Sequence, residues 1–319
     1  MRRSRDVGLL VSRAREGNPR AVARLISLVE DGDEVLPAVA AALAPYAGSA
    51  QVVGLTGSPG VGKSTTTNEL VRALRSAGHR VGVLAVDPSS PFTGGAILGD
   101  RVRMQEHTTD PGVYIRSMSS RGHLGGLAAT TPQAVRVLEG AGCDVVLVET
   151  VGVGQAEVEI ASLADTTLVL LAPGMGDAIQ AVKAGILEIA DVFVVNKADR
   201  AGADATYRDI QGMLSLGERA AGDWRPQVVR AVAVKGEGID EVAAAIDKHR
   251  GWLVESGELR RRQEARAAAE VEAIALATLR ARLGSLREGT DLAALATLVA
   301  DGALDPHTAA ARLLAALRL

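Results

Sequence analysis

The sequence predicts an α/β protein: a mostly parallel sheet covered by helices, with helical extensions at both ends. Short apolar runs alternate with helical stretches over residues 51–250, whereas the flanking segments show helical patterns without such runs. Hydrophobic residues make up 47% of the 319-residue chain and charged residues 23%, the balance of a folded protein with a substantial core. We therefore expect an N-terminal helical extension (1–48), a central domain (49–250) and a C-terminal helical region (251–319).

The N-terminal extension contains start signals for two helices. Asn18 is a capping residue type, and Pro19 after it is favoured at the first helical position. A second helix is expected near Pro37, before the stretch AVAAALAPYA.

The central domain contains apolar, strand-like runs, most of them separated by helical stretches. They are QVVGLT, RVGVLAV, DVVLVE, TTLVLLA, DVFVVN and QVVRAVAV. Continuous apolar strands of this kind are typical of a parallel sheet buried on both faces. Right-handed crossovers then bring all carboxyl ends of the strands to one edge, where ligands bind.

The C-terminal region is rich in Ala, Arg, Glu and Leu and predicts a long helix followed by two shorter ones, the second capped at Asp305. Apolar residues with roughly helical spacing share one face of the long helix: Val271, Ile274, Leu279 and Leu283. This face needs a partner surface, either from its own domain or from a second chain. Because a symmetric pair is the commonest solution, we expect a homodimer.

Composition argues against several classes of protein. A net charge of −3 and 2% aromatic residues argue against nucleic-acid binding. The single cysteine, Cys143, excludes a disulfide framework, and no Cys- or His-rich metal motif is present. No run of about 18 apolar residues exists, and the basic N-terminus has too short an apolar stretch for a signal peptide. We therefore expect a cytoplasmic protein without a membrane span.

The stretch GSPGVGKS (57–64) matches the phosphate-binding pattern GxxxxGK[ST] and lies between a strand-like run and a helical stretch. Glycines let backbone N–H groups converge on phosphate oxygens, and the next helix presents its positive dipole end there. We expect Lys63 to reach the β- and γ-phosphates as a catalytic group, and the Ser64 hydroxyl to bind magnesium. The expected phosphate-side set is Gly57, Ser58, Pro59, Gly60, Val61, Gly62, Lys63, Ser64 and Thr65.

The stretch NKAD (196–199) predicts the base of the bound nucleotide, because it ends a buried strand at the ligand edge. The Asp199 carboxylate can accept hydrogen bonds from guanine N1–H and the 2-amino group, whereas adenine offers neither donor in that geometry. Lys197 is expected to pack its stem over the base, and Asn196 to tie this loop to the phosphate loop.

Acidic residues follow two further strands at the same edge. Glu149 ends the run DVVLVE, where it can orient magnesium and so act in catalysis; Asp87 ends VLAVD, and Asp100 follows in ILGD. With Ser64, these carboxylates form the expected magnesium environment.

The segment after Glu149 supplies two more candidates. Gly152 lies three residues beyond it, where a backbone N–H can sense the γ-phosphate. Gln155 is the candidate for positioning the attacking water. The stretch from Arg116 to Gly126 is expected to be a glycine-rich loop, in which Arg116 or Arg121 meets phosphate or a partner, or only solvent.

Six stretches resemble the MeaB/ArgK family of GTPases, which includes the protein defective in one form of methylmalonic aciduria. Members of this family are chaperones for adenosylcobalamin-dependent acyl-CoA mutases such as methylmalonyl-CoA mutase. The stretches span most of residues 15–318 and are GSPGVGKSTTTNEL, VLAVDPSSPFTGGAILGDRVRM, YIRSMSSRGHLGGLA, VLVETVGVGQAEVEI, PGMGDAIQAVKAGILEIADVFVVNKAD and GALDPHTAAARLL.

The resemblance implies a P-loop GTPase domain of the SIMIBI type that binds GTP or GDP with Mg²⁺, and a C-terminal extension that forms a homodimer. It places Asp87, Asp100 and Glu149 around an ion bound by Ser64, and it implies switch segments near 87–108, 149–159 and 173–184. One departure concerns the second base-side loop, where Val232 replaces the family's serine. Contacts to guanine there are then expected from the backbone of Ala233 and Val234.

The switch near 173–184 includes a candidate for partner control, Lys183. Binding of the mutase is expected to order this segment and bring Lys183, or a neighbouring group, towards the phosphates, which speeds hydrolysis. The alternative for this segment is a short loop and a core helix, with Lys183 as a solvated surface charge. Two alternative functions of the whole protein stay open. A nickel-type metallochaperone GTPase needs Cys and His ligands near the nucleotide, which are missing here. An ATPase or kinase associated with amino-acid transport conflicts with Asp199.

Overall fold

The computed structural model describes residues 7–31, 34–87, 105–107, 109–119, 130–150, 156–174, 187–216, 220, 222–287 and 290–315. The chain separates into two compact units, which divide after Gln263.

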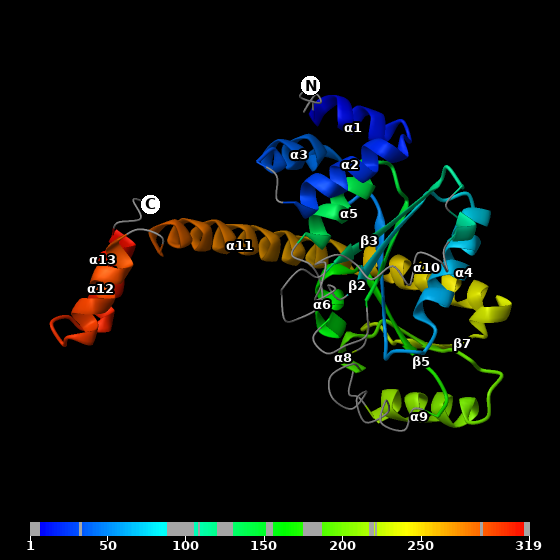
Figure 1. The fold of residues 1–319 in the computed structure, drawn as a ribbon. Helices are drawn as coiled ribbons and strands as arrows, with labels where there is room; N and C mark the ends of the chain where they lie inside the picture. Colours follow the sequence, from blue (N-terminus) through cyan, green and yellow to red (C-terminus); the bar gives the residue numbers. More distant parts are fainter. Residues whose placement is uncertain are drawn as a thin grey trace. The chain divides into compact units, whose positions relative to one another are not determined.

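The larger unit is built on the sheet drawn in Figure 1. This sheet has seven strands in the order β3-β2-β4-β1-β5-β6-β7, and all pairs between these strands are parallel. The strands are β1 (Gln51–Thr56), β2 (Val81–Asp87), β3 (Val113–Ser119), β4 (Val145–Glu149), β5 (Thr166–Leu171), β6 (Val192–Val195) and β7 (Gln227–Arg230). Six of them lie in the six predicted runs, so the predicted parallel α/β fold is confirmed. Because β1 is central, the loop that follows it lies in the middle of the carboxyl edge.

Helices cover both faces of the sheet. One face packs against α4 (Lys63–Ser76) and α10 (Ile239–Glu255), with alternate β1 residues Val53 and Leu55 in that core. The other face packs against α5 (Thr131–Gly140) and α6 (Ala156–Leu163), and further along the sheet against α9 (Ala203–Leu216). The short helices are η1 (Ala44–Tyr46), η2 (Gln105–His107), α8 (Leu187–Ile189) and η4 (Ala233–Lys235).

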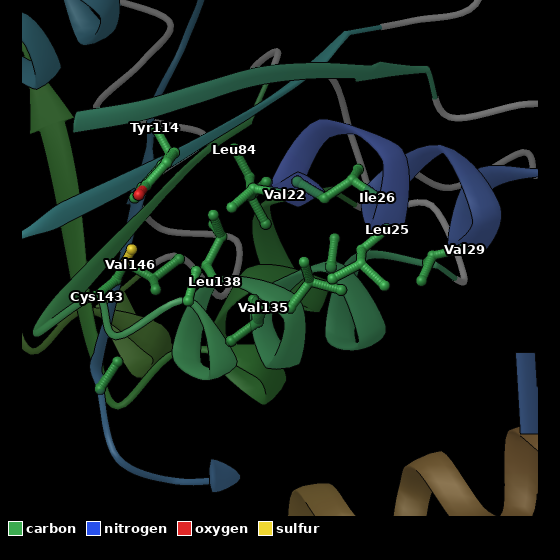
Figure 2. Close-up of a cluster of buried hydrophobic side chains, with 14 of the residues drawn as sticks. Val22, Leu25, Ile26, Val29, Leu84, Tyr114, Val135, Leu138, Cys143 and Val146 are labelled. Atoms are coloured by element: carbon green, nitrogen blue, oxygen red, sulfur yellow. The ribbon is translucent and has the colours of Figure 1, made fainter. Parts of the chain in front are cut away.

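The N-terminal helices α1 (Val7–Arg15), α2 (Pro19–Glu30) and α3 (Leu36–Leu43) pack together and onto α5. The predicted cap is confirmed, because Asn18 Oδ1 accepts hydrogen bonds from the N–H groups of Arg20 (3.0 Å) and Ala21 (3.2 Å). Figure 2 shows how α2, α5 and the sheet share one buried cluster. The labelled side chains are Val22, Leu25, Ile26, Val29, Leu84, Tyr114, Val135, Leu138, Cys143 and Val146.

Strand β3 is an edge strand that the sequence prediction missed. The interpretation of Arg116 as the start of a loop is wrong, because it lies inside this strand. Its guanidinium forms an ion pair with Glu30 of α2 and hydrogen-bonds to Ser27 Oγ at 3.2 Å. Arg116 thus holds the N-terminal helices to the sheet edge; Arg121 lies outside the described residues.

A buried polar network joins the amino ends of three strands. Asp165 accepts the N–H of Val52 in β1, and Asp191 accepts the N–H of Thr167 in β5, both at 2.8 Å. Arg262 donates to the Asp165 carbonyl at 2.8 Å and to both carboxylate oxygens of Asp191 at 3.1 Å. Both aspartates are buried, and each carboxylate accepts hydrogen bonds there, as buried polar groups require.

His249 of α10 completes this network. Its Nε2 lies 3.3 Å from Asp191 Oδ1, its Nδ1 lies 2.9 Å from Thr166 Oγ1, and the side chain is fully buried. The ring stacks on Trp252 and lies 4.6 Å from the ring of Trp224. The pKa of His249 is lowered from 6.5 to about 4, mainly because the ring is buried. The negative charge of Asp191 raises this pKa in part, and the positive charge of Arg262 contributes to lowering it. The imidazole is therefore neutral at pH 7.

The smaller unit comprises the part of α11 (Glu258–Arg287) that follows Gln263, together with α12 (Thr290–Ala300) and α13 (Pro306–Ala315). The predicted cap at Asp305 is confirmed by its 3.0 Å hydrogen bond from the N–H of Thr308. Val271 and Ile274 of α11 are 68% and 48% exposed. Among the described residues, no helix is both long and apolar enough to cross a membrane.

Candidate nucleotide-binding site

The loop from Gly57 to Gly62 connects β1 to α4 and depends on glycine at two points. Gly57 has φ of 140°, and a Cβ there would lie 2.3 Å from the Leu170 carbonyl oxygen of β5. Gly62 has φ of 100°, and a Cβ there would lie 2.3 Å from Asn196 Nδ2. Only glycine tolerates both the backbone angle and the close approach. The loop is therefore packed against the neighbouring strand and the loop after β6.

Lys63 is the first residue of α4, and its side chain is buried although it is charged. Its Nζ donates to the carbonyl oxygens of Gly57 (2.7 Å) and Ser58 (3.3 Å), so the ammonium lies against the phosphate loop. The first turn of α4 contains no acidic residue, and the positive end of its dipole adds to the lysine charge. This combination suits a phosphate group. Pro59 and Gly60 are exposed at the tip, and Thr65 is half-buried.

Glu149 contacts the same helix from the end of β4. It pairs with Leu55 in the sheet register, two residues before Gly57, and is 4% exposed. Ser64 Oγ donates to Glu149 Oε1 at 2.6 Å, and Thr67 Oγ1 donates to Oε2 at 3.0 Å. A hydroxyl and a carboxylate are the hard oxygen ligands that magnesium prefers, so this part of the predicted ion site fits that metal.

Thr67 was not among the sequence candidates. The signal for it is its spacing, since position 67 lies one turn after Ser64 on the same helix face. Other candidates cannot be placed. Only the backbone of Asp87 is described, at the end of β2, and four further candidates lie outside the described residues: Asp100, Gly152, Gln155 and Lys183.

The loop after β6 is tied to the phosphate loop by two side chains. Asn196 Nδ2 donates to the Val61 carbonyl at 2.8 Å, and Asn196 Oδ1 accepts the N–H of Ala233 at 3.1 Å. Lys197 has φ of 56°, the left-handed region, and its Nζ donates to the Gly60 carbonyl at 2.6 Å. The phosphate-side and base-side loops are therefore held as one surface, with Asn196 linking three segments.

Asp199 lies on a short turn whose carboxylate is partly exposed. The turn is closed by the Arg200 N–H on the Lys197 carbonyl (2.9 Å). Asp199 Oδ2 lies 3.5 Å from Lys235 Nζ, which belongs to η4 after β7. Val234 beside it is 78% exposed. The sequence did not single out Lys235 as a site residue, because its neighbour Asp199 is 36 positions away in the chain.

These loops at the carboxyl edge of a parallel sheet define a P-loop nucleotide-binding protein. Residues 22–287 match the family model described as Methylmalonyl Co-A mutase-associated GTPase MeaB, and the chain belongs to this family of GTPases. The predicted family is thereby confirmed, and membership implies that guanine nucleotides are bound.

Similar proteins cover most or all of the chain. A protein of Pyrococcus abyssi named "Putative GTPase" is 46% identical over 304 residues, which is 94% of each chain. GTPase ArgK of Escherichia coli is 39% identical over 258 residues, covering 78% of this chain and 77% of its own. A crystal structure of a protein named LAO/AO transport system kinase is 26% identical, covers 100% of both chains and has a TM-score of 0.72.

Proposed function

We propose that this protein is a GTP-binding and GTP-hydrolysing chaperone that gates cofactor loading and protection of an adenosylcobalamin-dependent acyl-CoA mutase, such as methylmalonyl-CoA mutase. The family description, which names a mutase-associated GTPase, supports the choice of partner. The structural observation that supports the nucleotide part is the bond from Asn196 to the Val61 carbonyl, which joins the base-side motif to the phosphate loop.

In this proposal the chain acts on GTP through charge and positioning. Lys63 stabilises negative charge on the transferring phosphoryl group, and Ser64 and Glu149 hold the magnesium ion that shields the phosphates. Asp199 selects guanine. Hydrolysis by the protein alone is slow, about 10⁻⁴ to 10⁻² s⁻¹, as is typical of P-loop GTPases that lack a supplied catalytic group.

The mutase supplies control by binding the GTP and GDP states differently. The described chain leaves β5 at the nucleotide edge through Pro173 and Gly174, whose φ of 82° lies in the region that favours glycine. Lys183 follows in this segment. Partner binding that brings Lys183 to the phosphates would raise the hydrolysis rate about 10³-fold or more.

The test measures GTP hydrolysis with and without a cobalamin-dependent acyl-CoA mutase from the same organism. We expect stimulation, and we expect Lys183→Ala to lose most of the ratio of stimulated to basal rate. Lys248→Ala, an exposed lysine on α10, is the matched control and should keep the full ratio. Lys63→Ala should abolish hydrolysis in both conditions. If no mutase stimulates, the partner assignment is wrong; if Lys183→Ala is stimulated fully, the control passes through another segment.

A second candidate function is an ATPase or kinase associated with amino-acid transport, which the name of the structurally similar transport system kinase favours. Competition between ATP and GTP for the site separates the two, because the transport proposal needs ATP binding at least as tight as GTP binding. A nickel-type metallochaperone GTPase would instead retain nickel through equilibrium dialysis.

We also propose that the protein is a cytoplasmic homodimer formed through the C-terminal region. The exposed side chains of Val271 and Ile274 support this, because apolar residues on one helix face gain from a second copy. Light scattering should then give twice the chain mass of 32.9 kDa, whereas a monomer would contradict the proposal.

A further inference from the structure

Lys235 is a cation placed beside the carboxylate that is proposed to read the base. Its Nζ lies 3.5 Å from Asp199 Oδ2, and the two side chains are 52% and 41% exposed. The pair is thus a solvent-facing ion pair, and it is held to one oxygen of the carboxylate.

The backbones on both sides of this pair are fixed. On the base-side loop, the Ala198 N–H donates to the Ala231 carbonyl at 3.0 Å. On η4, the Lys235 N–H donates to the Val232 carbonyl at 2.8 Å, and Val232 forms an antiparallel bridge with Glu237. The two loops therefore hold the backbones of Lys235 and Asp199 within reach of each other, and the pair can open through movement of the side chains.

We propose that Lys235 competes with guanine for Asp199 and thereby weakens discrimination between guanine and hypoxanthine. This inference rests on the proposed interpretation of Asp199 as the base-reading residue. Guanine presents two donors, N1–H and the 2-amino group, and needs both carboxylate oxygens. Hypoxanthine lacks the amino group and needs one oxygen, which the carboxylate can offer while Lys235 keeps the other. Guanine must therefore share Oδ2 with Lys235 or displace it, whereas hypoxanthine can use the other oxygen and leave the ion pair intact.

The size of the effect follows from the exposure of the pair. Ion pairs in contact with water are worth little, because both charges are well solvated when apart. Removing the lysine charge should therefore change the ratio of GDP to IDP affinity by about two- to fivefold, far less than loss of Asp199 itself. GDP and IDP carry the same phosphates, so the general attraction of a positive charge for the nucleotide cancels from this ratio.

The experiment measures dissociation constants of GDP and IDP by isothermal titration for the full-length protein and three variants. Lys235→Met keeps the aliphatic stem and should raise the ratio of GDP to IDP affinity by about two- to fivefold. Lys235→Arg keeps the charge and should behave as wild type. Lys248→Met is the matched control, because it removes the same charge from α10. The next residue, His249, lies beside Asp191 at the amino end of β6, away from Asp199. This variant should leave the ratio of GDP to IDP affinity unchanged.

Salt provides a second measurement. At about 1 M KCl, where charges are screened within roughly 3 Å, the difference between wild type and Lys235→Met should disappear. An unchanged or lower ratio for Lys235→Met at low salt would overturn the inference while leaving the proposed function intact. If wild type itself binds ATP as well as GTP, the proposed role of Asp199 fails, and the inference fails with it.

Discussion

The two edges of the sheet use the same kind of residue for different purposes. At the carboxyl edge, Asp199 is partly exposed on a turn and faces an exposed lysine side chain. At the amino edge, Asp191 is buried, accepts hydrogen bonds from Arg262 and the Thr167 N–H, and lies 3.3 Å from His249 Nε2. β6 begins one residue after Asp191 and ends four residues before Asp199, so a single strand separates them. The role of an aspartate next to a strand therefore depends on its surroundings. What matters is the end of the strand at which it lies and the number of protein hydrogen-bond donors around it.

This comparison predicts that substitutions at the carboxyl edge change selectivity, whereas substitutions at the amino edge change stability. The strongest effect is expected for Asp199→Asn. The amide cannot accept two hydrogen bonds from guanine, so preference for GTP over XTP should fall by about 10⁴-fold, with a shift towards xanthosine nucleotides. Competition binding with labelled GDP measures this shift.

The stability of the Asp199→Asn variant should stay within about 0.5 kcal/mol of wild type, because its site is open to water. Asp204→Asn is the matched control, since Asp204 is an exposed carboxylate at the start of α9 that pairs with Arg230. It should change neither property. Retained guanine preference in Asp199→Asn would contradict the base assignment.

The carboxyl edge could be predicted from the sequence to a large extent, because its motifs are local. Eight consecutive residues define the phosphate loop, and four define the base-side motif. The sequence predictions missed two kinds of feature: an edge strand with a charged residue at its centre, and contacts between residues far apart in the chain. β3 was missed because Arg116 interrupts its apolar pattern, and Arg116 is accommodated there by Glu30 and Ser27 of α2. The contacts of Lys235 with Asp199 and of Thr67 with Glu149 join separate segments, so they could be recognised only in the folded structure.

The amino edge could not be predicted at all. Its members come from four separate segments and contain no motif: Asp165, Asp191, His249 and Arg262. Each has an ordinary surface interpretation when considered alone, and His249 was one of five scattered histidines. Only the parallel sheet, by aligning the amino ends of its strands with α10 and the start of α11, brings them together.

The next effect in size concerns Asp191→Ala. It removes the carboxylate that Arg262 and His249 face, inside the protein, and breaking a buried ion pair from one side typically costs about 3–5 kcal/mol. Urea unfolding should show this loss in the free energy of unfolding. Asp191→Asn keeps an acceptor for the Thr167 N–H and should lose less. Asp204→Ala, which breaks an exposed pair, should cost about 1 kcal/mol or less.

GDP affinity decides whether the edges are independent. At a temperature where the Asp191→Asn variant is folded, its preference for GDP over ADP should equal that of wild type. A loss of the preference for GDP over ADP would show that β6 transmits the change from Asp191 to Asp199. The two ends of the strand would then not be independent. A loss of stability below about 1 kcal/mol in Asp191→Ala would instead show that the network is weaker than its burial implies.

The smallest effect is the pH dependence that His249 adds at the amino edge. Its pKa is about 4 in the folded protein and 6.5 when unfolded, because burial disfavours the charged ring. The unfolded chain therefore binds the proton first as the pH falls. The free energy of unfolding is therefore unaffected by His249 above pH 6.5. It falls progressively between pH 6.5 and pH 4, by about 3 kcal/mol at pH 4.

Unfolding of wild type and His249→Gln at each pH isolates the effect of His249, because the other titrating groups are common to both proteins. The difference between the two should change by about 3 kcal/mol between pH 7 and pH 4. Curves that stay parallel over this range would show that Asp191 compensates the charge of a protonated His249, and the amino edge would then tolerate a change of charge as the carboxyl edge does.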